Sequence, residues 1–269
     1  MTITAEERKD HFSRMIKQKK DELNMLKKSR TQGLDILFLF DSTGSMEDYI
    51  EEARRCIVRV VSEVSEYVPD ARMGAIVYKD HGDEGEDDFY LLKVSPMSLG
   101  KERLIKFIRS ADIAPGEGGS GPEAVECALH EANLLDWRKN VPNVIVLIGD
   151  KPPHGVMDSF SACSRGIDYR KEVSMLKSRG TKVYSVLCNN VTQTEATFRW
   201  ISKETGGKFL CLDEAGDLSS LIIGICARET GQLPYYERKL LQYGAMTPSI
   251  RTLLSRLKDG PSEKIRLLK

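Results

Sequence analysis

Three oxygen-bearing side chains, Asp41, Thr43 and Ser45, stand at alternate positions directly after the apolar segment 34–40. A short apolar run of this kind is typical of a strand that is buried on both faces of a parallel sheet. The turn after such a strand lies at the edge where open α/β sheets bind their ligands. Carboxylate and hydroxyl oxygens are the donors preferred by a hard divalent cation such as Mg²⁺. The spacing therefore predicts a metal site in this turn.

Two further segments point to the same edge. Asp150 follows a second apolar run, residues 141–148, and we expect it to emerge beside Asp41. The loop 115–121 is rich in glycine, contains Ser120 and precedes a predicted helix that opens at Pro122. Glycines allow the backbone to approach another group closely, but the spacing of a phosphate-binding Walker loop is absent.

The segment Asp41-Ser42-Thr43-Gly44-Ser45 resembles the Asp-x-Ser-x-Ser motif of the von Willebrand factor A (vWA) family, with threonine in place of the first serine. Residues 149–155, Gly-Asp-Lys-Pro-Pro-His-Gly, resemble a second family segment. The resemblance implies a metal-ion-dependent adhesion site. Its ligands would be Asp41, Thr43, Ser45, Ser120 and Asp150. Ser120 stands where the family often has an aspartate, so whether it coordinates the ion directly stays open.

In this family the metal, Mg or Mn, captures an acidic residue of a protein partner. The residues expected to line the rim of the site are Ser42, Met46, Glu47 and Lys151. The sequences of these motifs, together with Tyr-Lys-Asp at 78–80, are most similar to those of intracellular vWA domains attached to alpha-type kinases. The strands and helices expected up to residue 229 are all used by the vWA sheet, so the resemblance does not extend to kinase activity.

The order of the predicted elements indicates an α/β fold. Apolar strands alternate with amphipathic helices from 34 to about 229, which favours a Rossmann-like, doubly wound, mostly parallel sheet. Residues 89–94 are expected to add a short antiparallel edge strand. We expect three parts: a charged N-terminal helix at 1–32, a vWA domain at 33–229 and a helical extension at 230–269. For the first part, a docking helix and a coiled-coil contact both remain open.

Composition limits the functional classes. The 269 residues carry 40 basic and 40 acidic side chains, so the overall charge gives no indication of a nucleic-acid partner. Neither a signal peptide nor a membrane span is visible. The six cysteines are scattered, without Cys-x-x-Cys pairs or a nearby histidine cluster, and are interpreted as buried free thiols. A cytoplasmic protein is therefore predicted, and its oligomeric state is undetermined.

Two other functions are weighed. A metal-dependent hydrolase would need a base or nucleophile beside the metal, for which Asp83 and His154 are the candidates. A scaffold would use its terminal helices for contacts and keep a vestigial metal site. The acidic turn 80–88 lacks the ligand order of a calcium-binding loop, and His81 within it is interpreted as a surface residue. The protein is not expected to be an enzyme.

Overall fold

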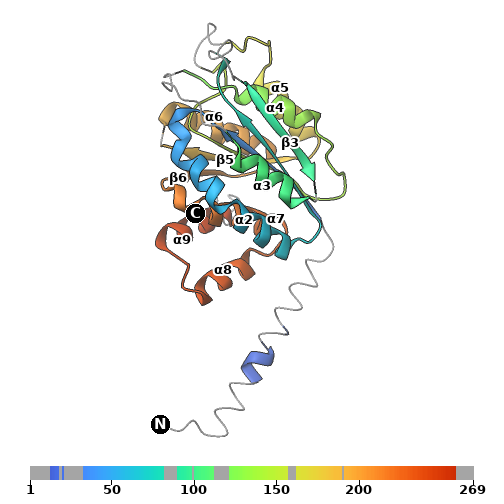
Figure 1. Ribbon diagram of the computed structural model, residues 1–269, viewed down its shortest axis with the longest axis vertical. Coiled ribbons are helices and arrows are strands. Elements are labelled where there is room, and N and C mark those ends of the chain that lie inside the picture. The colour runs from blue at the N-terminus through green and yellow to red at the C-terminus, as the bar shows by residue number, and fades with distance from the viewer. Residues whose placement is uncertain are drawn as a thin grey trace, which may run out of the picture.

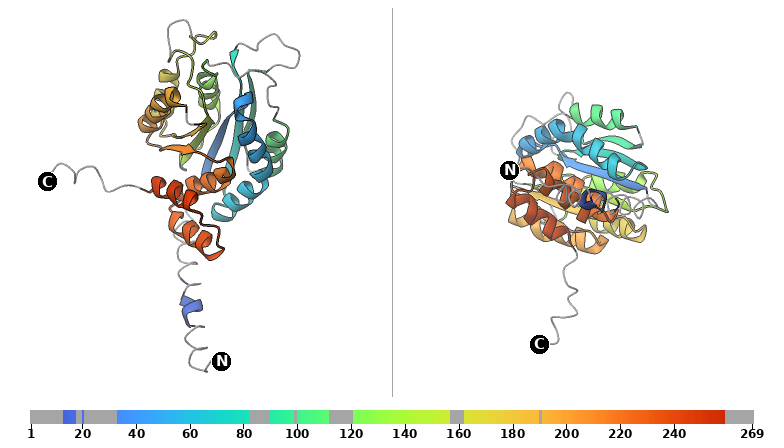
Figure 2. Two further views of the ribbon diagram at one scale, coloured as in Figure 1. Left: turned by 90° about the vertical axis from the view of Figure 1, so that its left-hand side faces the viewer. Right: turned by 90° about the horizontal axis from the view of Figure 1, so that it is seen from below.

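A computed structural model describes residues 13–17, 20, 33–81, 90–98, 100–111, 121–156, 162–189 and 191–258. Within these ranges, six strands form one mixed sheet in the order β3-β2-β1-β4-β5-β6, with helices on both faces (Figures 1 and 2). The strands are β1 Leu34–Asp41, β2 Ala71–Tyr78, β3 Leu92–Ser98, β4 Asn143–Gly149, β5 Lys182–Cys188 and β6 Phe209–Leu212. All neighbouring pairs are parallel except β2 and β3. The predicted fold class is confirmed, including the antiparallel edge strand.

The two central strands are buried because nearly every residue in them is apolar. β1 and β4 have no exposed position. Ile36, Phe38 and Phe40 belong to the hydrophobic core on one face of the sheet, whereas Leu37 and Leu39 belong to the core on the other face. This alternation is the period of two that a strand imposes on its side chains. Both faces must therefore be covered by helices.

The helices divide between these two faces. The first core includes buried residues of α2, α3 and α7, and the second includes residues of α4, α5 and α6. Their bounds are α2 Glu47–Tyr67, α3 Lys101–Arg109, α4 Val125–Leu134, α5 Tyr169–Ser178, α6 Thr192–Thr205 and α7 Leu218–Glu229. Among the helices of the described residues, none combines the length and apolar character needed to cross a bilayer.

Two more helices, α8 Leu233–Gln242 and α9 Pro248–Leu257, follow the sheet domain. Both pack against α7, at the end of the molecule opposite the carboxyl ends of the central strands (Figures 1 and 2). Gly224 makes the close packing possible, because a Cβ atom there would lie 2.5 Å from Leu254 Cδ2 and 3.1 Å from Leu257 Cδ1. These helices complete the first core. The boundary predicted at residue 230 stays a prediction.

The N-terminal part is described only in fragments. Residues 13–17 and 20 are helical, and the side chains of 13–17 are exposed. The rest of the helix predicted over 1–32 lies outside the described residues. Asp83 and Ser120 also lie outside them.

A buried ion cluster fixes the amino end of β1. Asp35 is fully buried and accepts hydrogen bonds from Arg72 Nε and Nη2 at 3.0 and 2.6 Å. It also accepts from Arg138 N and Nε at 2.9 and 2.8 Å. Burial alone would raise the pKa of Asp35, but these bonds outweigh it and hold the pKa below its ordinary value. The cluster connects β1, β2 and the segment before β4, far from the carboxyl edge.

Candidate metal centre

The turn after β1 is organised by Asp41, the last residue of that strand. Its Oδ1 atom accepts hydrogen bonds from Thr43 N at 2.9 Å and from Thr43 Oγ1 at 2.6 Å. Its Oδ2 atom is buried and has no hydrogen-bond partner among the described residues. Ser45 Oγ lies 3.4 Å from Thr43 Oγ1, and Ser45 is exposed. A carboxylate oxygen and two hydroxyls thus occur together in one turn that reaches the surface.

Asp150 lies at the same edge because β4 is the direct neighbour of β1, with Phe40 opposite Ile148. Its Oδ2 atom accepts a hydrogen bond from Asn189 Nδ2 at 3.1 Å, and its Oδ1 atom is buried without a partner in the described structure. The backbone carbonyl of Asp150 accepts from Thr194 Oγ1 at 2.7 Å. The turn after β4 is therefore hydrogen-bonded to the first turn of α6.

The two carboxylates influence each other. Burial, the largest effect, raises the pKa of Asp41, and the nearby charge of Asp150 raises it further, against the hydrogen bonds from Thr43. The pKa of Asp41 is consequently about 7, compared with an ordinary value of 3.8. Buried acids of like charge are costly unless a cation or a proton neutralises them.

Sequence reasoning missed three further polar groups at this edge. Glu123 Oε2 and the Tyr78 hydroxyl are buried and have no partner among the described residues. Burial first, and then the charges of Asp41, Asp80 and Asp150, raise the pKa of Glu123 to about 10. Asn189, the third, also donates to the Ser45 carbonyl at 2.9 Å and so connects the turn after β1 with the turn after β4. Its position directly after β5 is the sequence signal that could have identified it.

The donor set fits a divalent cation. Oδ2 of Asp41 and Oδ1 of Asp150 are buried oxygens left without a hydrogen-bond donor in the described residues. The Thr43 hydroxyl donates to the other oxygen of Asp41, and Ser45 Oγ lies 3.4 Å from that hydroxyl. Such an all-oxygen set is suited to Mg²⁺ or Mn²⁺. Gly149 allows this close grouping, because a Cβ there would lie 2.7 Å from the Tyr78 hydroxyl and 3.4 Å from Asp41 Oδ2.

Comparison with known proteins identifies the family. The sequence profile of the von Willebrand factor type A domain matches residues 35–222. The chain belongs to this family. vWA domains are generally adhesion or protein-binding modules, and they often bind a divalent metal.

Two similar proteins agree with the assignment. The chain is 28% identical over 145 positions to "Alpha-protein kinase vwkA" of Dictyostelium discoideum. This match covers 52% of the chain and 22% of that protein. The structure is similar to the pilus adhesin SpaC from Lactobacillus rhamnosus GG in its open conformation, with a TM-score of 0.54 and 13% identity. That match covers 76% of this chain and 30% of the adhesin, so the chain spans less than a third of either relative.

The predicted rim of the vWA site needs correction at two positions. Met46 is fully buried in the hydrophobic core, because the 3₁₀ turn Gly44–Met46 directs it beneath the site. Ser42 is also fully buried, and its hydroxyl donates to the Tyr78 carbonyl at 2.9 Å. Neither residue can contact a partner. Glu47 is exposed and Lys151 is half-buried, so both remain candidates for the rim.

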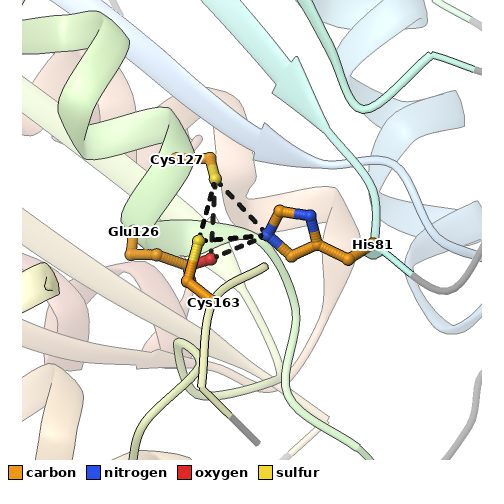
Figure 3. Close-up of side chains that lie close together, drawn as sticks. All are labelled: His81, Glu126, Cys127 and Cys163. Carbon is orange, nitrogen blue, oxygen red and sulfur yellow. Dashed lines mark hydrogen bonds and ion pairs between the residues drawn. The ribbon is translucent and has the colours of Figure 1, made fainter. Parts of the chain in front are cut away.

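The interpretation of His81 as a surface residue was wrong. Its side chain is only 9% exposed and lies among Glu126, Cys127 and Cys163 (Figure 3). The sequence suggested no histidine near the cysteines because these positions are far apart along the chain. The fold brings them together at the carboxyl end of β2 and the start of α4. All six cysteines are free in this structure; five of them are buried and Cys211 is half-buried.

His154 lies next to this second cluster. Its Nε2 atom is 3.2 Å from Asp80 Oδ1, and its Nδ1 atom is 3.2 Å from Glu126 Oε1. Burial alone would lower the pKa of His154, but the contacts with Asp80 and Glu126 raise it to about 9. The imidazole is therefore cationic at neutral pH and is unsuited to act as a general base there.

Proposed function

We propose that this vWA domain binds a protein partner through a divalent metal, Mg or Mn, at the carboxyl edge of its sheet. Asp41, Thr43, Ser45 and Asp150 would hold the ion, directly or through water. The support is the pair of buried carboxylate oxygens, Asp41 Oδ2 and Asp150 Oδ1, that have no hydrogen-bond donor among the described residues. When bound, the ion supplies a coordination position that an acidic side chain of a partner can occupy.

One side chain at the site, Lys151, favours capture of an anion. Ser45 and Glu47 are exposed at the mouth of the site, and Asp41 and Asp150 are buried below it. Lys151 is half-buried, and its positive charge opposes the rise in the pKa of Glu123, which shows that it is felt within the site. A cation of this kind assists an incoming carboxylate. In this proposal Ser120 remains a candidate for a further ligand.

Catalysis forms no part of the proposal. His154 is held as a cation by two acids. We therefore propose binding without hydrolysis or phosphoryl transfer, and we do not propose a nucleic-acid partner. The six free cysteines are compatible with a reducing compartment, and we propose a cytoplasmic location on that basis.

Titration with Mn²⁺, followed by electron paramagnetic resonance, tests the metal site without knowledge of the partner. We expect one bound Mn²⁺ per wild-type chain, displaced by Mg²⁺, and a loss of affinity of at least about 100-fold in Asp41→Ala. Asp48→Ala is the matched control, because Asp48 is an exposed acid seven residues away, in the first turn of α2. Equal Mn²⁺ affinity in wild type and Asp41→Ala would refute the proposal.

Capture from lysate with Mg²⁺ or with a chelator then tests partner binding. Proteins retained by wild type in Mg²⁺, and lost both with chelator and in Asp41→Ala, are the expected result. Retention of the same proteins with chelator and by Asp41→Ala would support the scaffold alternative instead. Surface changes such as Leu241→Ser and Tyr243→Ser address that alternative, because both residues are exposed on the C-terminal extension. Truncation of residues 230–269 does not test that alternative, because α8 and α9 contribute to the hydrophobic core.

A further inference from the structure

Four side chains from three separate segments converge near the carboxyl end of β2. His81 follows β2, Glu126 and Cys127 stand in the first turn of α4, and Cys163 lies in the segment before α5 (Figure 3). One potential ligand atom from each of these residues lies within 4.8 Å of all the others. Glu126 and Cys127 are 0% and 1% exposed, Cys163 is 8% exposed and the His81 side chain is 9% exposed. The cluster is thus almost closed to solvent.

The distances match those around a tetrahedral zinc ion. Bonds of about 2.0 Å to nitrogen or oxygen and 2.3 Å to sulfur place neighbouring ligand atoms about 3.3–3.8 Å apart. His81 Nε2 lies 3.1 Å from Glu126 Oε1 and 3.4 Å from each cysteine Sγ atom. Cys127 Sγ lies 3.6 Å from Glu126 Oε1 and 3.7 Å from Cys163 Sγ. Five separations therefore agree with one small central ion to within about 0.2 Å.

Neighbouring groups orient the ligands. Ser164 Oγ lies 2.9 Å from His81 Nδ1, which directs Nε2 towards the cluster. The backbone N–H of His154 donates to Glu126 Oε2 at 3.1 Å, while Glu126 Oε1 lies 3.1 Å from His81 Nε2 and 3.2 Å from His154 Nδ1. Metal-binding histidines and carboxylates commonly have outer partners of this kind.

We propose that His81, Glu126, Cys127 and Cys163 form a structural Zn²⁺ site. Two thiolates and an imidazole select zinc over magnesium, which prefers an all-oxygen set. Four protein ligands leave no position for water, so the ion would stabilise the fold rather than act in catalysis. It would connect the end of β2, the start of α4 and the segment before α5. This site is separate from the adhesion-type site of the proposed function and does not depend on it.

The full chain, purified without chelator, provides the first test. We expect about one zinc per chain by mass spectrometry of the metal. Replacement by Co²⁺ should give the visible bands of a tetrahedral ion and a near-ultraviolet thiolate charge-transfer band. Thiol modification with a mercurial should release the zinc. These measurements need no variant and so do not depend on whether a variant folds.

Variants then assign the ligands. Cys127→Ser and Cys163→Ser should each lower the zinc content at least tenfold. Circular dichroism of both variants checks that they are folded. Cys56→Ser is the matched control, because Cys56 is also 8% exposed but lies in α2, away from the cluster. Asp41→Ala should retain zinc even where it loses Mn²⁺. The inference is overturned if wild type binds neither Zn²⁺ nor Co²⁺, if both cysteine variants keep zinc, or if Cys127 and Cys163 are found as a disulfide.

Discussion

Asn189 Nδ2 lies 3.1 Å from Asp150 Oδ2, and the same nitrogen donates to the Ser45 carbonyl at 2.9 Å. One amide therefore connects the turn after β1 with the turn after β4. It donates to Oδ2 of Asp150, whereas Oδ1 has no donor among the described residues. Asn189 adopts a positive φ of 56°, a conformation that asparagine tolerates better than most residues.

Replacing Asn189 should weaken metal binding without removing a ligand. We expect Asn189→Gly to reduce Mn²⁺ affinity about tenfold, since outer-shell groups commonly contribute 10–100-fold. Asn189→Ala should reduce the affinity similarly but also lower the free energy of unfolding by about 1 kcal/mol, because alanine disfavours the left-handed conformation. Mn²⁺ titration and chemical denaturation separate the two effects. Unchanged affinity in the glycine variant would exclude this role for the amide.

The metal-free domain should lose stability as pH rises. Between the ordinary pKa of 3.8 and the folded value of about 7, the folded state holds the Asp41 proton more tightly than the unfolded state does. Stability from this residue is therefore greatest below pH 4 and declines up to about pH 7. At pH 8 in chelator, Asp41→Asn should raise the free energy of unfolding by about 1–3 kcal/mol. Denaturation at pH 5 and pH 8 tests the sign of the difference.

The same ionisation should control metal affinity. The ion needs the carboxylate form of Asp41, so Mg²⁺ affinity should rise about tenfold between pH 6 and pH 8. Calorimetric titration at several pH values measures this change. A flat profile would show that Asp41 is already ionised at pH 6 and would contradict the effect assigned to burial.

The buried ion cluster at the other end of β1 should act on stability alone. Asp35→Asn removes the buried anion that Arg72 and Arg138 share and leaves them only their exposed partners, Asp136 and Asp70, so it should cost about 2–4 kcal/mol by chemical denaturation. Arg59→Ala breaks an exposed pair with Glu63 and should cost at most about 0.5 kcal/mol. Asp35 and Asp41 are six residue steps apart along β1, about 20 Å. Mn²⁺ affinity should therefore remain at the wild-type value in both variants.

Gly224→Ala tests the packing of α9 on α7. In an exposed helix this change would stabilise by about 1 kcal/mol. Here the new methyl group would meet Leu254 and Leu257, so we expect a net loss of about 1–2 kcal/mol. The double variant Gly224→Ala/Leu254→Ala should lose less than the sum of the single changes. A gain in stability in the single variant would mean that α9 does not pack at this position.

Much of the fold could be predicted because the strongest signals are local. β1 and β4 are nearly continuous apolar runs, and both form strands at the predicted places. Other elements begin or end a few residues from the expected positions. The edge strand is predicted over 89–94, but β3 spans Leu92–Ser98, because Ser98 is still paired with Met73 in the sheet. Pairing across strands overrides local spacing at such ends.

The candidate site was only partly predictable. Asp41 and Asp150 could be placed at one edge because both follow apolar strands, and the structure has their strands adjacent. Met46 could not be placed correctly, since a residue just after a polar turn gives no sign that a 3₁₀ turn will bury it. His81 and Cys163 are 82 positions apart, and no local spacing indicates their contact. Contacts of this kind become visible only from the tertiary structure.

The described chain enters and leaves the domain at the same end of the sheet, the end where β1 begins. The described chain enters β1 at Gly33, beside Asp70, and leaves α9 where Arg228 Nε donates to the Leu257 carbonyl. Arg228 adjoins Glu229, which binds Lys182 at the first residue of β5. Any polypeptide fused before residue 33 or after residue 258 would therefore be anchored on the side remote from Asp41 and Asp150. A domain fused at either point could therefore be exchanged without obstructing the approach of a ligand to the edge that holds Asp41 and Asp150.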